Sequence, residues 1–511
     1  MKRKNLFILP LAMFGVLCSV SCGGTKDTTV PDSDPVVNPD DEMTADPLEG
    51  KNVTIRFDSQ WGQSMNNLFH SWASEFMKLH PSVTVEVNKI QGDYNGVKDK
   101  EISDISAGYN QWGDIVSCYP DHCVEYIATG RCVDLMKFVD NDDPNIALGP
   151  NSRKDLTGAA KKYFEIKYND FGMYCAPFAV STEFMMYNKE LLTWTIPGVN
   201  NDERITEDYL NDMTWEEFFT VFCPNFMKEN ARRPKEQQLL ITDDGEYSVL
   251  GYDSDDNAFI SLLEQYGYPY TSVNDVREGS IDFNTPEARQ LVKNWNHYRN
   301  MNYVITEGTN EKVKPSNGMF ASKKCLFAIG STGGINYASS ALDNSGLDIK
   351  VGALSIPHAE GHRPAIVLQG GSLCILSHTT EDDADRQLAA WMFYKYITQQ
   401  KNCIRWGSST GYAPIRKSVY ATSAWNQITK LTDDQGNDKV GISLLTALSS
   451  RYVQLHSDEM FLNEVFTGSS VCRQEVGSLF KLLLGKKEAE CTDDYIAAQF
   501  EQTVKNMKLV M

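Results

Sequence analysis

Residues 53–87 read VTIRFDSQWGQSMNNLFHSWASEFMKLHPSVTVEV, and this stretch points to the fold class. Apolar and polar residues alternate over 53–57 and again over 83–87, which predicts two strands. Between them, bulky apolar residues recur every three or four positions from 68 to 79, as on one face of a helix, and Pro81 ends that helix. Strand, helix and strand in this order form the unit from which parallel α/β sheets are built.

The same succession of short apolar runs and amphipathic stretches continues along the chain. The predicted strands lie at 114–116, 184–187, 239–241, 326–329, 351–356 and 373–376, and the predicted helices at 215–226, 256–266, 286–299, 383–398 and 461–484. About 460 residues follow position 50, too many for a single core. We therefore predict an α/β protein of two lobes, each a mostly parallel sheet flanked by helices.

The N-terminus has the pattern of an export signal. Basic residues at 2–4 precede an apolar run from 6 to 20 that is too short for a stable membrane span, and small residues surround Cys22. This arrangement is similar to the lipobox of bacterial lipoproteins, so we expect residues 1–21 to be a signal peptide and Cys22 to carry the lipid. Cys18 is the rival position, and an ordinary cleaved signal is the alternative. We expect an extracytoplasmic protein, anchored to a bacterial membrane through that lipid.

Residues 22–50 hold four prolines among acidic and small polar residues, with almost no bulky apolar side chain. Such a segment cannot bury enough surface to offset its ordering entropy, so we predict a disordered tether between membrane and globular body. The formal net charge of the whole chain is -20. This charge disfavours a nucleic-acid partner and binding to an anionic surface.

Ten cysteines follow Cys22, and most stand in apolar runs where a small buried residue is expected. Whether any of them form disulfides stays open, since an exported protein can oxidise them. Cys118 and Cys123 are close enough in sequence to share a metal, but nothing nearby in the chain completes a zinc set. Residues 253–264 approach a calcium-binding loop, yet Ala258 replaces the glycine of its sharp turn, and a capped helix is the competing interpretation. We predict no metal site and no cofactor.

Five segments follow one another in a fixed order: FDSQWGQSM at 57–65, APFAVSTEFMMYNKEL at 176–191, TWEE at 214–217, AIGSTG at 328–333 and STGYAPIR at 409–416. None of these strings is diagnostic alone. In their order and spacing they resemble the sugar-type extracellular solute-binding proteins of bacterial ABC importers, a family that includes maltose-binding and glycerol-3-phosphate-binding proteins. The resemblance covers nearly the whole chain beyond the tether.

The resemblance implies two α/β lobes joined by crossing segments, with the ligand in the cleft and the lobes closing over it. We expect crossings near Val180, Ile329 and Cys374. The boundaries that follow are 51–180 with 330–374 for the N-terminal lobe, and 181–329 with 375–511 for the C-terminal lobe.

The function that the resemblance implies is capture of a small polyhydroxylated solute, such as a sugar, by a monomer that delivers it to the permease subunits of an ABC importer. Glycerol-3-phosphate or a glycerophosphodiester is the second candidate ligand, and a sensing role is a further alternative. A surface glycoside hydrolase would need two carboxylates about 5 to 9 Å apart. Acidic pairs such as Asp142-Asp143 stand in polar turns or helix starts, and no Ser-His-Asp elbow or HExxH motif occurs. We predict a protein that is not an enzyme.

A sugar offers hydroxyls that donate and accept hydrogen bonds, and an apolar ring face, so its receptor needs short polar groups and flat aromatic rings. Polar side chains follow the first crossing at 181–183, and glycines at 331–334 and 370–372 allow the backbone to approach a ligand. The resemblance implies ligand contacts at 331–334 and at Tyr412. The predicted ligand-binding residues are Trp61, Tyr94, Tyr119, Ser181, Thr182, Glu183, Ser331, Thr332, Gly370, Gly371, Trp406 and Tyr412. For residues 181–183, hydrogen bonding to the hinge backbone is the competing interpretation.

Overall fold

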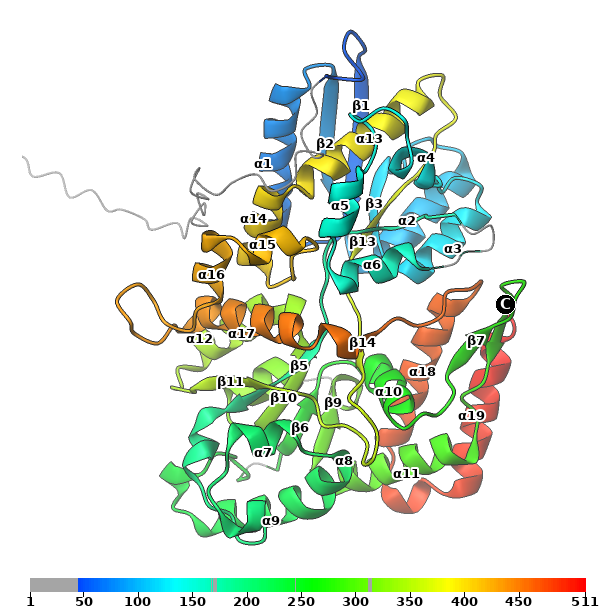
Figure 1. The fold of residues 1–511 in the computed structure, drawn as a ribbon. Helices are drawn as coiled ribbons and strands as arrows, with labels where there is room; N and C mark the ends of the chain where they lie inside the picture. Colours follow the sequence, from blue (N-terminus) through cyan, green and yellow to red (C-terminus); the bar gives the residue numbers. More distant parts are fainter. Residues whose placement is uncertain (1–44, 167, 169–171, 244, 311–314) are drawn as a thin grey trace, which may run out of the picture.

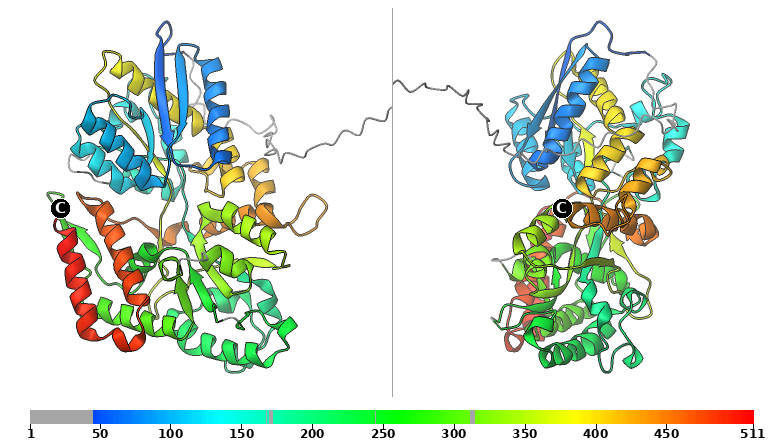
Figure 2. Two further views of the ribbon diagram at one scale, coloured as in Figure 1. Left: turned by 180° about the vertical axis from the view of Figure 1, so that it is seen from behind. Right: turned by 90° about the vertical axis from the view of Figure 1, so that its left-hand side faces the viewer.

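The computed structural model describes residues 45–166, 168, 172–243, 245–310 and 315–511. Within them the chain forms two α/β lobes, one above the other in Figure 1, with extended segments running between them. Figure 2 shows the same division from two further sides. The predicted fold class is confirmed. The predicted signal peptide, the lipidation site at Cys22 and most of the predicted tether lie outside the described residues.

The upper lobe of Figure 1, here called the first lobe, is built on a five-stranded sheet. Its strands, in spatial order, are β2 (Val83–Lys89), β1 (Val53–Ser59), β3 (Ile115–Cys118), β13 (Ser372–Ile375) and β4 (Ala176–Pro177). β1 runs parallel to β2 and β3, whereas β13 runs antiparallel to β3 and β4. The alternation of apolar and polar residues in the sequence matches the two faces of β1. Val53, Ile55 and Phe57 are buried, and Thr54 is exposed.

Helices pack around this sheet. They are α1 (Gln63–Leu79), α2 (Tyr94–Ala107), α3 (Pro120–Ala128), α4 (Met136–Val139), α5 (Pro150–Asp155), α6 (Gly158–Phe164), α13 (Asp383–Ile397), α14 (Gln400–Thr410), α15 (Lys417–Tyr420) and α16 (Ser423–Thr429). The apolar stripe of α1 places Phe69, Trp72 and Phe76 in the core. Most of α13, including Trp391, is buried because this helix crosses the lobe against α1, β1 and β13.

The lower lobe of Figure 1, the second lobe, has its own five-stranded sheet. Its order is β11 (Val351–Leu354), β5 (Glu183–Asn188), β10 (Cys325–Ser331), β6 (Ser248–Tyr252) and β9 (Val304–Thr306). Two small two-stranded sheets accompany it, β7 (Thr271–Val273) with β8 (Gly279–Ile281) and β12 (Ile366–Val367) with β14 (Met460–Phe461). Every residue of β5 and β6 is buried, so both faces of the main sheet are covered.

The helices of the second lobe are α7 (Glu207–Asn211), α8 (Trp215–Glu217), α9 (Cys223–Arg232), α10 (Asp255–Gln265), α11 (Pro286–Asn300), α12 (Ile335–Ser345), α18 (Ser469–Leu484) and α19 (Asp493–Met507). A π-helical turn, η4 (Phe218–Phe222), joins α8 to α9. Helix α17 (Gly441–Leu455) lies between the lobes, because it contacts α12 of the second and α14 and α16 of the first. Among the described residues, no helix has the length and hydropathy to cross a membrane.

The lobe boundaries differ from the predicted ones. Ile329 is not a crossing, because β10 lies inside the second sheet between β5 and β6, and β11 then pairs with β5. The chain returns to the first lobe only at 368–371, after which β13, α13 and α14 pack there. Most of segment 330–374 therefore belongs to the second lobe, and 375–429 to the first. The third crossing joins α16 to α17.

Each sheet is also mixed, with two parallel and two antiparallel pairings. The antiparallel pairings all involve β5 or β13. Each of these strands enters its lobe directly from a crossing segment and therefore runs away from the hinge. Their neighbours in the parallel parts of the sheets run toward the hinge, which is why β5 and β13 oppose them.

Of two local predictions, one is wrong and one is confirmed. Residues 239–241 form no strand, because the side chain of Asn230 accepts hydrogen bonds from the backbone of Leu239 and Leu240 and holds them in a bend. The stretch that approached a calcium loop is helix α10, as the competing interpretation held. Its cap is Ser254, whose hydroxyl accepts from the backbone nitrogen of Asn257.

Candidate functional site

A polar cavity of ≈ 390 Å³ lies between the two lobes. The first lobe contributes Asp93, Asn95, Tyr119, Asp121 and His122, the second contributes Glu183, Asp253, Ser254, Asp256, Asn257, Glu307, Ser331, Ser470, Arg473 and Gln474, and Gln369 comes from the crossing segment. Many of these residues follow the carboxyl ends of β3, β6, β9 and β10 or begin the helices after them. This is the edge at which open α/β sheets bind ligands.

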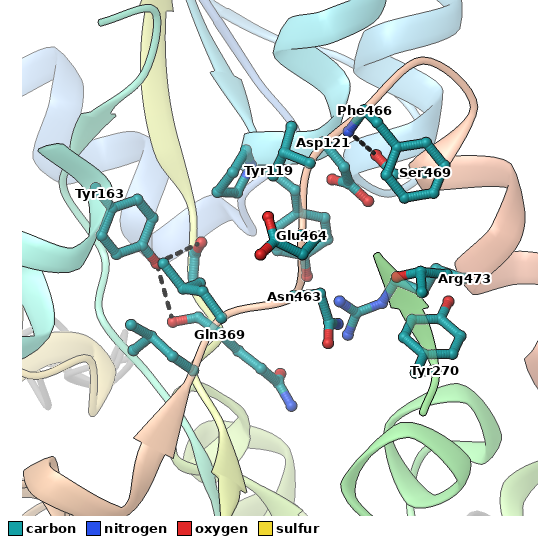
Figure 3. A pocket seen from close by; sticks show the side chains of 16 residues that line it. Tyr119, Asp121, Tyr163, Tyr270, Gln369, Asn463, Glu464, Phe466, Ser469 and Arg473 are labelled. Atoms are coloured by element: carbon teal, nitrogen blue, oxygen red, sulfur yellow. Dashed lines mark hydrogen bonds between the residues drawn. The ribbon is translucent and has the colours of Figure 1, made fainter. Parts of the chain in front are cut away.

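A narrower space of ≈ 40 Å³ adjoins the cavity. The residues that line both are Tyr119, Asp121, Gln369 and Arg473. In Figure 3 the guanidinium of Arg473 points toward Asn463, which stands on the segment between β14 and α18. The hydroxyl of Tyr163 donates to the backbone oxygen of Gln369 at 3.4 Å and so ties the crossing segment to the first lobe.

Arg473 carries the single Arg or Lys charge among the described residues that line the larger cavity. Its Nε donates to Asp256 Oδ2 at 2.7 Å, and a second guanidinium nitrogen donates to Asn257. Burial is the largest single influence on the pKa of Asp256 and would raise it. The charge of Arg473 and the hydrogen bonds from Ser254, Arg473 and the backbone of Asn257 together hold that pKa below its ordinary value. Arg473 is thus neutralised by Asp256, and the other carboxylates leave the cavity acidic.

Glu183 stands at the base of the cavity, where β5 begins, and its side chain is buried. The hydroxyl of Tyr252 donates to Oε2 at 2.7 Å and the side-chain amide of Asn257 donates to Oε1 at 3.0 Å. Burial nevertheless raises the pKa of Glu183 to about 7, because two neutral donors replace less than the full hydration of a carboxylate. Glu183 therefore changes charge near neutral pH.

The lobes contact each other beside the cavity. The side-chain amide of Gln474 in α18 donates to Asn95 Oδ1 of the first lobe at 2.9 Å. At a separate place, Gly333 of the second lobe lies against the ring of Tyr412, and a Cβ added to this glycine would stand 2.6 Å from that ring. The structure therefore shows the lobes drawn together.

Four predicted aromatic residues, Trp61, Tyr94, Trp406 and Tyr412, form one buried cluster next to the hinge. Ring centroids lie 5.4 Å apart for Trp61 and Trp406, and 5.5 Å apart for Trp406 and Tyr412. Tyr119 packs on Tyr94 with ring centroids 4.2 Å apart, and so connects the cluster to the cavity. Within the described part of the chain, the indole nitrogen of Trp406 is buried without an acceptor.

Residues 71–433 match the family model described as bacterial extracellular solute-binding protein, which is most of the chain. The chain belongs to the bacterial extracellular solute-binding proteins. Members of this family serve ABC importers outside the cytoplasm, as binding proteins without catalytic activity, so the family confirms that this protein is not an enzyme. No curated protein matches the chain in sequence.

Solved structures of other solute-binding proteins share the fold. UgpB from Mycobacterium tuberculosis, solved with glycerophosphocholine, is 15% identical, with a TM-score of 0.62 over 89% of this chain and 98% of its own. Lmo0181 from Listeria monocytogenes, in complex with cycloalternan, is 14% identical, with a TM-score of 0.62 over 90% and 100%. Maltose-bound MalE3 of T. maritima is 15% identical, with a TM-score of 0.61 over 90% and 100%.

The remaining predicted residues of this solute-binding protein lie in the hinge. The hydroxyl of Thr182 donates to the backbone oxygen of Val367 at 2.8 Å, and Ser181 pairs through its backbone with Gln369. Thr332 accepts from the backbone nitrogen of Thr182 at 3.2 Å. For the side chain of Thr182, bonding to the hinge backbone is the role that the competing interpretation named. Glu183 instead bonds to the side chains of Tyr252 and Asn257 and lines the cavity.

Glycine is required at both positions of the second crossing. Gly370 has a φ of +119°, and a Cβ there would stand 1.6 Å from the backbone oxygen of Ala179. A Cβ on Gly371 would stand 2.4 Å from the Tyr94 hydroxyl. These glycines let the crossing segment pass close to Ala179 and Tyr94, and this packing role does not depend on a ligand.

Of the twelve predicted residues, Tyr119, Glu183, Ser331 and Gly370 line the two spaces between the lobes. The cavity also contains residues that sequence reasoning did not select. Asp93 and Asp121 begin helices directly after strands, a position that could have marked them. Arg473 and Gln474 lie within a long amphipathic helix, where a charged or polar residue usually faces solvent, so no local signal distinguished them.

Proposed function

We propose that this solute-binding protein captures a carbohydrate, or a solute as rich in hydroxyls, between its lobes and delivers it to the permease subunits of an ABC importer. The polar cavity between the lobes carries the proposal. It offers carboxylate and amide acceptors, amide donors and hydroxyls from both lobes, and the flat ring of Tyr119. Because both lobes supply contacts, a bound solute stabilises the closed arrangement that a permease would recognise.

The aromatic cluster supports an extension of this site toward the hinge. Trp406 buries an indole donor without an acceptor among the described residues, which costs free energy that a ligand oxygen would recover. The cluster is reached from the cavity through Tyr119 and closed by the contact of Gly333 with Tyr412. We propose that the open lobes expose the predicted ligand-binding residues Trp61, Tyr94, Trp406 and Tyr412 to an incoming solute, and that closure at the contact of Gly333 with Tyr412 then holds the solute in place.

A glycerophosphodiester with a cationic head group is the second candidate. The acidic cavity would suit such a head group, and the structural neighbour UgpB was solved with glycerophosphocholine. The described lining of the cavity offers the phosphate no unpaired arginine, because Arg473 already pairs with Asp256. The carbohydrate therefore ranks first.

The chain from residue 45 onward contains every element described above and suits a thermal-shift screen against sugars, polyols, glycerophosphodiesters and amino acids. A ligand at about 100 times its Kd should add about 2.7 kcal/mol to the free energy of unfolding. Product analysis on each hit should find the solute unchanged. The absence of any shift with sugars and polyols, beside a clear shift with another class, would overturn the carbohydrate assignment.

A matched pair of tyrosines places the site. Tyr119→Leu removes the ring between the cavity and the aromatic cluster, and should weaken solute binding about 10-fold. Tyr268→Leu is the control, because Tyr268 lines a separate cavity of ≈ 470 Å³ formed by the second lobe alone. Calorimetric titration of both variants measures the difference. Equal affinities would move the site away from the interlobe cavity.

We also propose a membrane anchor at Cys22 and a monomeric state. Labelling of growing cells with a fatty-acid analogue should mark the protein, and Cys22→Ser should abolish the label while Cys18→Ser keeps it. Label that persists in Cys22→Ser, or chains that elute as dimers in size-exclusion chromatography, would contradict these assignments.

A further inference from the structure

Of the six described cysteines in the first lobe, five lie together: Cys118, Cys123, Cys132, Cys175 and Cys374. They come from five separate places in the chain. Cys118 ends β3, Cys374 lies on the neighbouring strand β13, and Cys175 directly precedes β4 on the other side of β13. Cys123 comes from α3 and Cys132 from the loop after it. The chain positions alone suggested only the pair Cys118 and Cys123, so the strand pairing of β13 is what brings the others to them.

Three of these sulfur atoms converge. The Sγ atoms of Cys118, Cys123 and Cys374 all lie within 4.8 Å of one another, and those of Cys118 and Cys123 are 3.6 Å apart. Neighbouring sulfurs of a tetrahedral zinc site, with Zn–S bonds of about 2.3 Å, are about 3.8 Å apart. The cluster is therefore close to the size of a thiolate metal site.

A fourth cysteine, Cys132, lies beside the three, although its sulfur is outside the group whose sulfurs lie within 4.8 Å of one another. The thiols of Cys123 and Cys132 both point to the backbone oxygen of Tyr174, at 3.8 and 3.9 Å. Cys175 instead accepts a hydrogen bond from the hydroxyl of Tyr168 at 3.3 Å. Cys132 is also partly exposed, whereas the other four cysteines are buried, so it offers a route by which an ion could enter.

We propose that Cys118, Cys123 and Cys374, with Cys132 as the fourth ligand, bind one thiophilic metal ion, Zn²⁺ or Cu⁺. Sulfur ligands select these soft or borderline d¹⁰ ions over magnesium and calcium. A site without a water ligand and buried below the surface is of the structural kind. It would join β3, α3 and β13, and so would fix the strand that follows the second crossing.

Binding requires thiolates. Each sulfur that becomes a ligand therefore releases its proton when the ion binds. The positive end of α3 (Pro120–Ala128) favours the negative charge that results, because Cys118 precedes this helix and Cys123 lies in its first turns.

A disulfide is the competing fate of two close thiols outside the cytoplasm. It would use two of the sulfurs and leave the third beside them with no role. A metal ion uses all of the converging sulfurs at their present separations. The geometry therefore favours the metal, and the oxidised pair becomes an outcome that the experiment must detect.

The test loads full-length protein with Zn²⁺ or with Cu⁺, removes weakly bound ion with a chelator and measures metal content. One ion per chain is expected for at least one of the two metals. The single variants Cys118→Ser, Cys123→Ser and Cys374→Ser should each lower the affinity at least 100-fold. Cys223→Ser and Cys325→Ser are the matched controls, because both thiols are buried in the second lobe and should leave the metal content unchanged.

Two measurements on the unaltered protein keep the result clear if a variant folds poorly. Co²⁺ should produce sulfur-to-metal charge-transfer absorption, and bound Zn²⁺ or Cu⁺ should protect Cys118, Cys123 and Cys374 from alkylation. Unaltered protein that retains neither Zn²⁺ nor Cu⁺ would overturn the proposal. So would mass spectrometry that finds a disulfide between two of these cysteines in most chains exported by the cell.

Discussion

The guanidinium of Arg473 lies 5.8 Å from the centre of the Tyr119 ring on the opposite lobe, while its Nε holds Asp256 at 2.7 Å. Arg473→Met should therefore leave Asp256 without its partner and destabilise the protein by about 1 to 3 kcal/mol. Adding Asp256→Asn removes the unpaired charge and should recover part of the loss. Urea unfolding measures both variants, and a double variant no more stable than the single one would contradict this account of the pair.

Gly370 should tolerate no side chain. Gly370→Ala places a Cβ against the backbone oxygen of Ala179 at a positive φ, so we expect a loss of more than about 3 kcal/mol of folding free energy. Gly334→Ala is the control, since its Cβ would meet nothing closer than 3.9 Å, and it should change stability by less than about 1 kcal/mol. Similar melting temperatures for the two variants would show that the crossing segment can shift.

Glu183 should make stability depend on pH. Its folded-state pKa of about 7 lies above the ordinary value of 4.5. Between these values the folded protein keeps the proton and the unfolded chain loses it. The stabilising contribution is therefore complete below about pH 4.5, is lost as pH rises toward 7, and amounts to a change on the order of 3 kcal/mol.

Glu183→Gln removes this titration while keeping the size of the side chain. The variant should lose less stability than the unaltered protein between pH 4.5 and 8. Only the difference between the two curves is diagnostic, because Glu101, buried beside Asp58, has a pKa raised to about 8 and titrates in both proteins. Parallel curves from urea unfolding would show that Glu183 is ionised throughout.

The contact of Gly333 with Tyr412 should control how far the lobes close. Gly333→Ala inserts a Cβ 2.6 Å from the tyrosine ring, so we expect a larger radius of gyration by small-angle X-ray scattering and weaker solute binding. Adding Tyr412→Ala makes room for the methyl group and should restore the compact form. If Gly333→Ala scatters like the neighbouring control Gly334→Ala, the contact does not hold the lobes together.

Local sequence patterns predicted seven of the fourteen strands that the described residues form, and long helices such as α1, α10 and α11. The alternation at Val53, Ile55 and Phe57 and the stripe on α1 report directly on which side chains are buried. They could not show which lobe β11 and the helices after β13 would join. That choice depends on contacts with elements far away in the chain, because β11 pairs with β5 and α13 packs on α1 and β1. The lobe boundaries were wrong for this reason.

The difference between local patterns and long-range contacts also separates the site residues that were predicted from those that were missed. Tyr119 and Glu183 stand next to strand ends, where a sequence can be searched for ligand contacts. Arg473 and Gln474 reach the cavity because α18 is placed opposite α3, and Cys374 reaches Cys118 because β13 pairs with β3. Only tertiary structure creates these neighbours.

The position of β13 in the chain affects the order in which the protein can assemble. The first sheet stops at β3 (Ile115–Cys118) and receives its next strand only at 372–375, after all five strands of the second sheet have been made. A nascent chain therefore carries an unpaired strand edge through the synthesis of the whole intervening segment. Such edges invite pairing with other chains. A chain of this topology gains from reaching the far side of the membrane unfolded, with chaperones covering β3 until its partner arrives.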